Sequence, residues 1–215
     1  MNRRELFSGS IGECAASPGQ AGAQLIPNVA LRTHEGKDVR FYDDLIKGKQ
    51  VIINMMYAHC EGFCPMITSR LVEIHKDFGA RMGRDLFMYS ITLKPEEDDP
   101  AALKEFADMH HALLPGWQFL TGAPFDIETL RFALFRHDHI KLDLDLQVHA
   151  GRLRIINDAT NRWLHVAPMA SKATVLQHIA WADPPRTPAQ RVQDNLRQQQ
   201  QIDREVDRFG YRKVI

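Results

Sequence analysis

The sequence predicts an α/β fold with a mixed central sheet that is flanked by helices. Residues 50–57 and 86–93 are near-continuous apolar runs, which are typical of strands buried on both faces of a sheet. After each run, apolar residues recur at helical spacing, over residues 65–80 and 100–111. Strands and helices that alternate in this way indicate one sheet with helices packed against it.

The other predicted elements complete this sheet. Residues 28–32 and 38–41 flank Glu35-Gly36-Lys37, a pattern that predicts an N-terminal β-hairpin. Asp98 or Asp99 is expected to cap the helix that starts at Pro100. Further along we expect a short strand at 117–120, a helix at 124–135, paired strands at 152–157 and 163–166, and a helix at 171–181. This order of elements fits a thioredoxin-like fold.

Length and composition point to one globular domain, which we place at residues 26–182. The chain has 215 residues, enough for a well-buried domain with tails. Lys+Arg and Asp+Glu both number 27, so the formal net charge is zero and indicates no nucleic-acid partner. No apolar run reaches the length of a membrane span, so no transmembrane span is expected.

Residues 1–25 are expected to form a twin-arginine-type export leader or a disordered arm. Arg3 and Arg4 precede apolar residues and a Gly- and Ala-rich stretch, and Ala21-Gly22-Ala23 offers a cleavage site of small residues. Glu13 interrupts the apolar stretch, which favours the disordered arm. A functional leader predicts a periplasmic protein, and a leader without function predicts a cytoplasmic one.

Residues 183–215 are predicted to be a linker followed by a polar C-terminal helix or tail. Prolines at positions 184, 185 and 188 stop the preceding helix. The following residues are rich in Gln, Arg and Asp, with a thin apolar stripe at helical spacing that includes Val192 and Leu196. Such a segment packs against the domain or a partner, or extends into solvent.

Two of the three cysteines stand close together in Cys60-Glu61-Gly62-Phe63-Cys64-Pro65, between a buried strand and a helix. Ligands of open α/β sheets lie at the carboxyl ends of strands, so this is a favoured place for chemistry. Pro65 suits the first turn of a helix, which puts Cys64 near the helix start. Backbone N–H groups and the helix dipole there are expected to stabilise a thiolate at both cysteines.

The spacing of this pair leaves several chemistries open. Three residues separate Cys60 from Cys64, whereas dithiol oxidoreductases usually have two. Two thiolates suit Cu(I), Zn(II) or a dithiol/disulfide couple, and two inert buried cysteines are the plainest alternative.

Other side chains near the pair are weaker candidates. His59 can influence Cys60 or bind metal, but a surface or structural role is favoured. Met55, Met56 and Met66 are expected to belong to the core, with Met66 alone close enough to the cysteines to merit a test.

The sequence around the cysteines, Tyr57-Ala58-His59-Cys60-Glu61-Gly62-Phe63-Cys64-Pro65, resembles the metal-binding loop of the Sco/SenC family. The resemblance extends over about residues 26–181 as an ordered series of segments. Residues 87–99 are similar to the family's strand and acidic loop, and Trp117-Gln118-Phe119-Leu120-Thr121-Gly122 also follows its pattern. The family assists copper delivery to cytochrome oxidase.

The resemblance implies a copper site made by Cys60, Cys64 and His149. The family has a distal histidine just before a late strand, and His149 in Gln147-Val148-His149-Ala150-Gly151 matches it. Two soft thiolates and one imidazole suit Cu(I), and Cu(II) can use the same three with an added ligand. One copper per chain is expected.

The function that the resemblance implies is a metallochaperone that delivers Cu(I) to a respiratory copper enzyme. The acceptor would be a subunit with a cytochrome oxidase-type or nitrous oxide reductase copper centre, and an upstream donor would supply the metal. This chain departs from the family pattern at Val148 and Lys94, where aspartates are usual, and in the turn at 157–160.

Two other functions use the same cysteines. In a thiol–disulfide reductase that keeps client cysteines ready for copper, Cys60 would attack and Cys64 would resolve, and only this alternative makes the protein an enzyme. A redox or copper sensor that signals through a partner is the third hypothesis.

Overall fold

The computed structural model describes residues 26–135, 152–184 and 187–189, together with positions 192, 196, 199–200 and 203–204. The chain divides into two compact units, Met1–Asp183 and Pro184–Ile215. All the described strands belong to the first unit. The proposed leader at 1–25 lies outside the described residues. Among the described residues, no helix combines the length and apolar character needed to cross a bilayer.

A seven-stranded mixed sheet forms the centre of the first unit, in the order β2-β1-β5-β4-β3-β6-β7. Strands β3, β4 and β5 are parallel, while β1 pairs antiparallel with β5 and β6 pairs antiparallel with β3. The strands are β1 (Ala30–Thr33), β2 (Asp38–Arg40), β3 (Gln50–Met56), β4 (Leu86–Thr92), β5 (Trp117–Gly122), β6 (Leu153–Asn157) and β7 (Arg162–Val166). The predicted mixed sheet and N-terminal hairpin are therefore confirmed.

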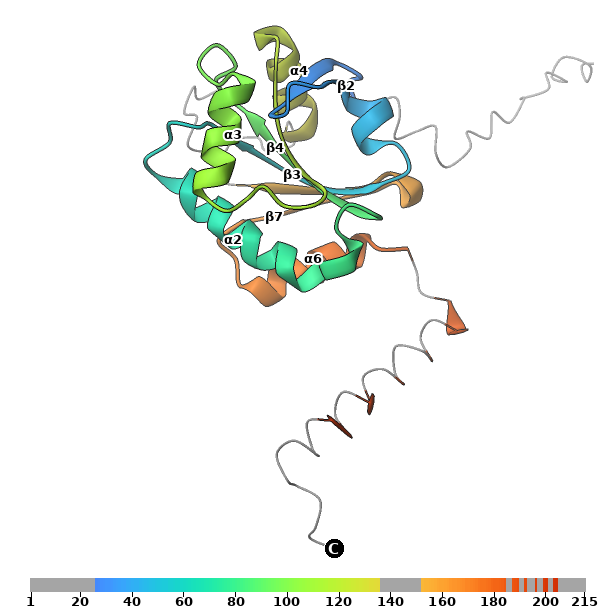
Figure 1. Ribbon diagram of the computed structural model, residues 1–215. Helices are drawn as coiled ribbons and strands as arrows, with labels where there is room; N and C mark the ends of the chain where they lie inside the picture. Colours follow the sequence, from blue (N-terminus) through green and yellow to red (C-terminus); the bar gives the residue numbers. More distant parts are fainter. Residues whose placement is uncertain are drawn as a thin grey trace, which may run out of the picture. The chain divides into compact units, whose positions relative to one another are not determined.

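Helices cover both faces of this sheet (Figure 1). On one face lie α2 (Phe63–Phe78), α3 (Pro100–Met109) and α6 (Lys172–Ala182), and on the other lie the short π-helical turn η1 (Phe41–Ile46) and α4 (Pro124–Phe135). Because successive side chains of a strand point to opposite faces, β3 supplies Ile52 to the first core and Ile53 to the second. The sheet thus separates two apolar cores.

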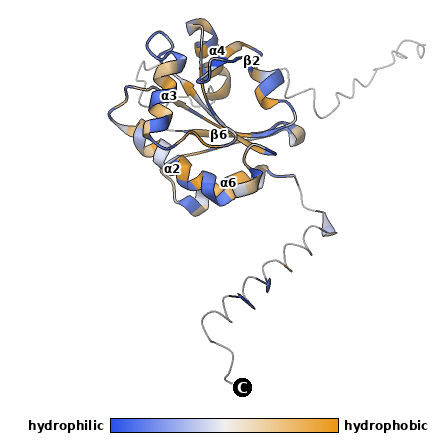
Figure 2. Cartoon of the chain, viewed as in Figure 1, coloured by the Kyte–Doolittle hydropathy of each residue, from blue (hydrophilic) through white to orange (hydrophobic). Residues whose placement is uncertain are grey.

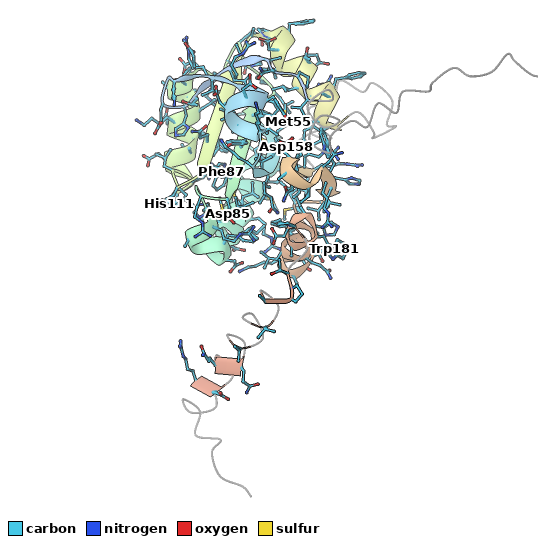
Figure 3. All side chains as sticks on the ribbon, turned by 90° about the vertical axis from the view of Figure 1, so that its right-hand side faces the viewer. Met55, Asp85, Phe87, His111, Asp158 and Trp181 are labelled. Carbon is cyan, nitrogen blue, oxygen red and sulfur yellow. The ribbon has the colours of Figure 1, made fainter. Side chains whose placement is uncertain are left out.

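Each helix is amphipathic in the way that one-sided packing requires. Along α2 the buried positions include Ile67, Leu71 and Ile74, which recur at helical spacing. Figure 2 shows hydrophobic and hydrophilic residues side by side along α2 and α6. At the end of α6, Trp181 is about half exposed and points away from the sheet (Figure 3).

The predicted helix starts are close to the observed ones. Helix α2 begins at Phe63, two residues before the predicted start, and contains Pro65 in its first turn. Asp99, the second of the two candidate caps, accepts a hydrogen bond from the backbone N–H of Ala102 at 2.8 Å. Ser171 caps α6 by accepting from the N–H of Thr174 at 3.1 Å.

The prediction that the second hairpin strand reaches Phe41 is wrong. The strand ends at Arg40, and Phe41 opens η1. Two side chains cause the turn: the Asp44 carboxylate accepts from the N–H of Arg40 at 2.7 Å, and the Asn28 side-chain oxygen accepts from the N–H of Tyr42 at 3.1 Å. The bend carries Phe41 into the core, where it is fully buried.

Two loops cross in backbone contact at Gly83 and Gly116, which lead into β4 and β5. Both glycines have positive φ, +79° and +73°. A Cβ added at Gly116 would lie 2.2 Å from the backbone nitrogen of Gly83, which is closer than any side chain tolerates. These glycines therefore allow the entries of the two parallel strands to lie against each other.

We expect Gly116→Ala to destabilise the domain by about 2 kcal/mol or more, because it combines backbone strain with a backbone clash. Urea denaturation followed by circular dichroism measures the free energy of unfolding. Gly48→Ala is the matched control: Gly48 also has a positive φ, +70°, but nothing lies within 4 Å of its added Cβ. Equal losses in the two variants would show that the contact with Gly83 adds nothing.

Candidate metal and dithiol site

The two cysteines lie where the central strand gives way to a helix. Strand β3 ends at Met56, a short loop follows, and α2 begins at Phe63. Cys60 is partly exposed in the loop, and Cys64 is buried in the first turn of α2. The two thiols are hydrogen-bonded to each other, so the structure brings them together as the sequence predicts.

The surroundings of Cys60 favour its thiolate. Burial of the thiol acts to raise the pKa, but hydrogen bonds to its sulfur outweigh burial and lower the pKa below its ordinary value. Donors are the backbone N–H groups of Cys64 and Gly62, the Cys64 thiol and the Tyr57 hydroxyl. Backbone N–H groups at the start of α2 thus act as expected on this cysteine.

Cys64 behaves in the opposite way, which corrects the expectation of a thiolate at both positions. Burial, with the hydrogen bond that it donates to Cys60 and the charges of Cys60 and Asp98, raises the pKa of Cys64 to about 12. A backbone hydrogen bond from Tyr57 lowers that pKa only in part. The two thiols are therefore unequal: the pKa of Cys60 lies below the ordinary value of a cysteine, and the pKa of Cys64 lies well above it.

Asp98 is the side chain that sequence reasoning missed. It is fully buried, and its Oδ2 accepts from the backbone N–H of Ala58 at 3.0 Å and from the Thr92 hydroxyl at 2.5 Å. Its Oδ1 has no hydrogen-bond partner among the described residues. Asp98 thus ties the start of the cysteine loop to the end of β4. The sequence offered one signal for this role. Two adjacent aspartates, Asp98 and Asp99, precede α3, and because one of them suffices to cap the helix, the other is available for a different contact.

Lys94 stands at a position where the Sco/SenC pattern has an aspartate. Its ammonium group lies 5.0 Å from the centre of the Tyr57 ring and forms an ion pair with Glu97 at 3.1 Å. Since the Tyr57 hydroxyl is a donor to Cys60, a cation over this ring makes the hydroxyl a better donor. This chain thus has a positive charge close to the cysteine loop.

The remaining predicted candidates are placed as follows. His149 lies outside the described residues, and those residues contain no group of three His, Cys, Asp or Glu that can hold a metal ion. His59 is exposed, in agreement with a surface role. Met55 and Met56 are buried as expected, but Met66 is not a core residue, because 52% of its surface is exposed. It lies on the outer side of the first turns of α2.

Tyr57→Phe is expected to raise the pKa of Cys60, because it removes one donor to the sulfur. The measurement is the pH dependence of iodoacetamide alkylation in a background with both Cys14→Ser and Cys64→Ser, so that Cys60 is the one cysteine left. The serine hydroxyl at position 64 keeps a donor beside Cys60. Removal of a donor destabilises the thiolate, so half-maximal alkylation is expected at a higher pH. An unchanged midpoint would rule out the tyrosine contribution.

Asp98→Asn is expected to lower the pKa of Cys64, because it removes a negative charge beside that thiol while keeping an acceptor for Ala58. Thiolate absorbance near 240 nm measures the shift, in a background with both Cys14→Ser and Cys60→Ser, in which Cys64 is the one cysteine left. The Cys64 thiolate is expected to form at a lower pH with asparagine than with aspartate. A shift in the other direction would mean that Asp98 acts on Cys64 through something other than its charge.

The chain matches the model of the SCO1/SenC family over residues 19–182. A Bacillus subtilis SCO1 protein homolog is 30% identical over 92 residues, a stretch that covers 43% of this chain and 46% of that protein. The sequence match therefore spans less than half the length of that relative.

Solved structures share the fold. A structure of BsSco, described as a member of the Sco family of cytochrome c oxidase assembly proteins with a disulfide switch, has a TM-score of 0.58 at 22% identity, covering 72% of this chain and 90% of its own. Copper-bound yeast Sco1 has a TM-score of 0.57 at 19% identity, covering 74% and 92%. At these identities the likeness establishes the thioredoxin-like arrangement alone.

Proposed function

Because the chain belongs to the SCO1/SenC family, we propose that it is a metallochaperone that binds Cu(I) and delivers it to a respiratory copper enzyme. The observation that carries the proposal is the pair of hydrogen-bonded sulfurs at the start of α2, one of them with a lowered pKa. Two soft sulfur ligands side by side suit Cu(I). Copper in the structures of yeast Sco1 and Arabidopsis thaliana ScoI supports the choice of metal.

The unequal thiols set an order for metal capture. Cys60 is the more exposed sulfur and the one with the lowered pKa, so it binds first, whereas Cys64 must give up a proton from a group with a pKa of about 12. The positive charge of the metal, once held by Cys60, lowers the cost of that deprotonation. Release to an acceptor runs in reverse, one sulfur at a time, so that the metal is never free. Cys60, the more exposed sulfur, exchanges with the incoming ligand.

His149 is the proposed third ligand, and one copper is bound per chain. The proposal rests on the family's distal histidine and on the preference of Cu(I) for few soft or borderline ligands. Cu(II) is expected to use the same three residues with one added ligand.

The proposed client is a subunit with a cytochrome oxidase-type copper centre or the copper centre of nitrous oxide reductase, supplied by an upstream copper donor. The assembly role named for BsSco supports the first. A working twin-arginine leader at 1–25 would place this transfer in the periplasm. Residues 26–182 are the proposed metal-binding domain, with 183–215 as a linker and polar helix or tail.

One observation also favours a thiol–disulfide reductase. A reductase needs an exposed attacking thiolate and a second thiol that resolves the mixed disulfide, and the pKa values of Cys60 and Cys64 differ in that direction. The disulfide switch named for BsSco is in line with such chemistry. The reductase, unlike the chaperone, has no need for His149.

Competitive Cu(I) titration of the reduced protein is expected to give one copper per chain, with His149→Ala weakening the affinity by tenfold or more. Even a residue that only supports a metal ligand is worth roughly 10- to 100-fold in affinity, so the loss of a ligand is expected to cost at least as much. His59→Ala is the matched control, since His59 is exposed beside Cys60 and is expected to leave the affinity unchanged.

The same variants separate the two functions. A chaperone loses copper affinity in His149→Ala and shows no turnover with a disulfide substrate. Equal Cu(I) affinity of wild type and His149→Ala, together with Cys60-dependent turnover, would overturn the three-ligand site and favour the reductase.

A further inference from the structure

A cavity of about 780 Å³ opens at the end of the sheet opposite the cysteines. It includes Phe87 and Tyr89 from the amino-terminal half of β4 and Gln118 from that of β5, whereas Cys60 follows the carboxyl end of the parallel strand β3. A seven-residue strand such as β3 is roughly 20 Å long, so the cavity and the cysteines are separate sites. A volume of this size is typical of small-molecule sites.

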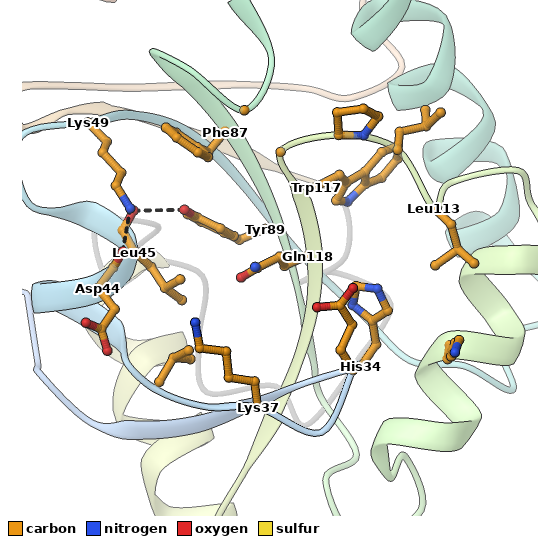
Figure 4. Close-up of a pocket in the computed structure, with 17 residues that line it drawn as sticks. His34, Lys37, Asp44, Leu45, Lys49, Phe87, Tyr89, Leu113, Trp117 and Gln118 are labelled. Carbon is orange, nitrogen blue, oxygen red and sulfur yellow. Dashed lines mark hydrogen bonds between the residues drawn. The ribbon is translucent and has the colours of Figure 1, made fainter.

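One wall of the cavity is aromatic. The rings of Phe87 and Tyr89 are stacked, with centres 6.5 Å apart and planes 12° from parallel. The Tyr89 hydroxyl donates to the backbone oxygen of Leu45 at 3.0 Å, so its hydrogen is already used inside the protein (Figure 4). Phe87 is the more exposed of the two rings and offers the flat surface to a ligand, while Tyr89, Val39 and Leu45 extend the apolar lining behind it.

The same part of the cavity carries positive charge. Lys37, at the hairpin turn, and Lys49, before β3, both line it. Lys49 lies 4.8 Å from the centre of the Phe87 ring. The nearby carboxylate of Asp44 accepts from the backbone N–H of Arg40 at 2.7 Å. Lys104 and Glu35 also line the cavity, so three ammonium groups face it with two carboxylates. This excess of positive charge favours an anionic group in the ligand.

A hydrogen-bond acceptor in the cavity is left over. Gln118 sits beside Tyr89 in the β4–β5 pairing, and in Figure 4 it reaches into the space that Lys37 and Tyr89 border. Its Oε1 is buried and has no hydrogen-bond partner among the described residues. A buried acceptor without a donor costs about 1–3 kcal/mol, so a ligand that brings an O–H or N–H group recovers that loss.

The histidine on the far side of the cavity is held in one tautomer. His34 Nδ1 accepts from the backbone N–H of Phe119 at 3.2 Å, and burial lowers the pKa of His34. The neutral ring thus carries its hydrogen on Nε2. Lysines rather than His34 therefore supply the charge that selects a ligand.

From the stacked rings, the two lysines and the free acceptor, we propose that this cavity binds a small aromatic carboxylate that carries a hydroxyl group. The ring lies along Phe87, the carboxylate meets Lys37 and Lys49, and the hydroxyl donates to Gln118 Oε1. Binding is non-covalent and uses neither cysteine. The inference does not rest on the copper site, so the two stand or fall by different measurements.

Isothermal titration calorimetry of the full chain with 4-hydroxybenzoate as the probe tests this site. We expect 4-hydroxybenzoate to bind about tenfold more tightly than benzoate, which lacks the hydroxyl, and than 4-hydroxybenzamide, which lacks the charge. Gln118→Leu is expected to bind 4-hydroxybenzoate no more tightly than benzoate. Lys37→Gln is expected to bind 4-hydroxybenzoate no more tightly than 4-hydroxybenzamide. Gln118→Leu removes the acceptor for the probe's hydroxyl group, and Lys37→Gln removes a positive charge that faces its carboxylate.

Lys47→Gln is the matched control, because Lys47 is exposed in the same region but does not line the cavity. It is expected to bind all three compounds as the wild type does. No binding of 4-hydroxybenzoate at millimolar concentration would overturn the proposal. Equal effects of Lys37→Gln and Lys47→Gln would also overturn it, because they would indicate general charge attraction. A Gln118→Leu variant that still binds 4-hydroxybenzoate more tightly than benzoate would overturn it as well. Unaltered far-ultraviolet circular dichroism spectra and thermal unfolding midpoints in all three variants check that the fold is intact.

Discussion

The burial of β3 on both faces is the constraint on which the rest of the structure depends. All seven of its residues are buried, and it pairs in parallel with β4 and antiparallel with β6. A strand held on both edges and both faces has one register, because a slip by one residue would exchange its two core faces. That register determines where the chain leaves the sheet. It therefore determines where Cys60 lies and where α2 begins.

The two cysteines at this strand exit carry the same thiol group, but their pKa values shift in opposite directions because their surroundings differ. Cys60, in the loop, receives hydrogen bonds from the start of α2, while Cys64 is buried in the first turn of that helix, near the charge of Asp98. Asp98 itself is placed by the loop after β4, the parallel neighbour of β3. Burial is the main cause that raises the pKa of Cys64, and the carboxylate from the neighbouring strand exit adds to it. The same parallel strands have their aromatic cavity at the opposite end, where loops rather than helix starts surround the opening.

Much of this could be predicted from the sequence, since it depends on local pattern. The apolar run at β3 and the Cys-Pro junction with α2 indicate a strand, a loop and a helix without reference to the rest of the chain. The turn at Phe41 was not predicted, because it depends on side-chain hydrogen bonds from Asp44 and from Asn28, which lies 14 positions before its partner Tyr42, and the hydrophobic pattern shows neither bond. The role of Asp98 was hidden for a similar reason: its partner Ala58 lies 40 positions away.

By itself, then, the sequence determined the order of strands and helices, the family resemblance and the cysteine pair beside a helix start. Those features follow from periodicity and spacing, which are properties of neighbouring residues. Only the folded protein shows that the pKa values of Cys60 and Cys64 shift in opposite directions, that Asp98 ties the cysteine loop to β4, and that the Gln118 side chain has a buried acceptor without a partner among the described residues. Each of these depends on burial and on groups far apart in the chain, because desolvation and hydrogen bonding act through space and not along the backbone.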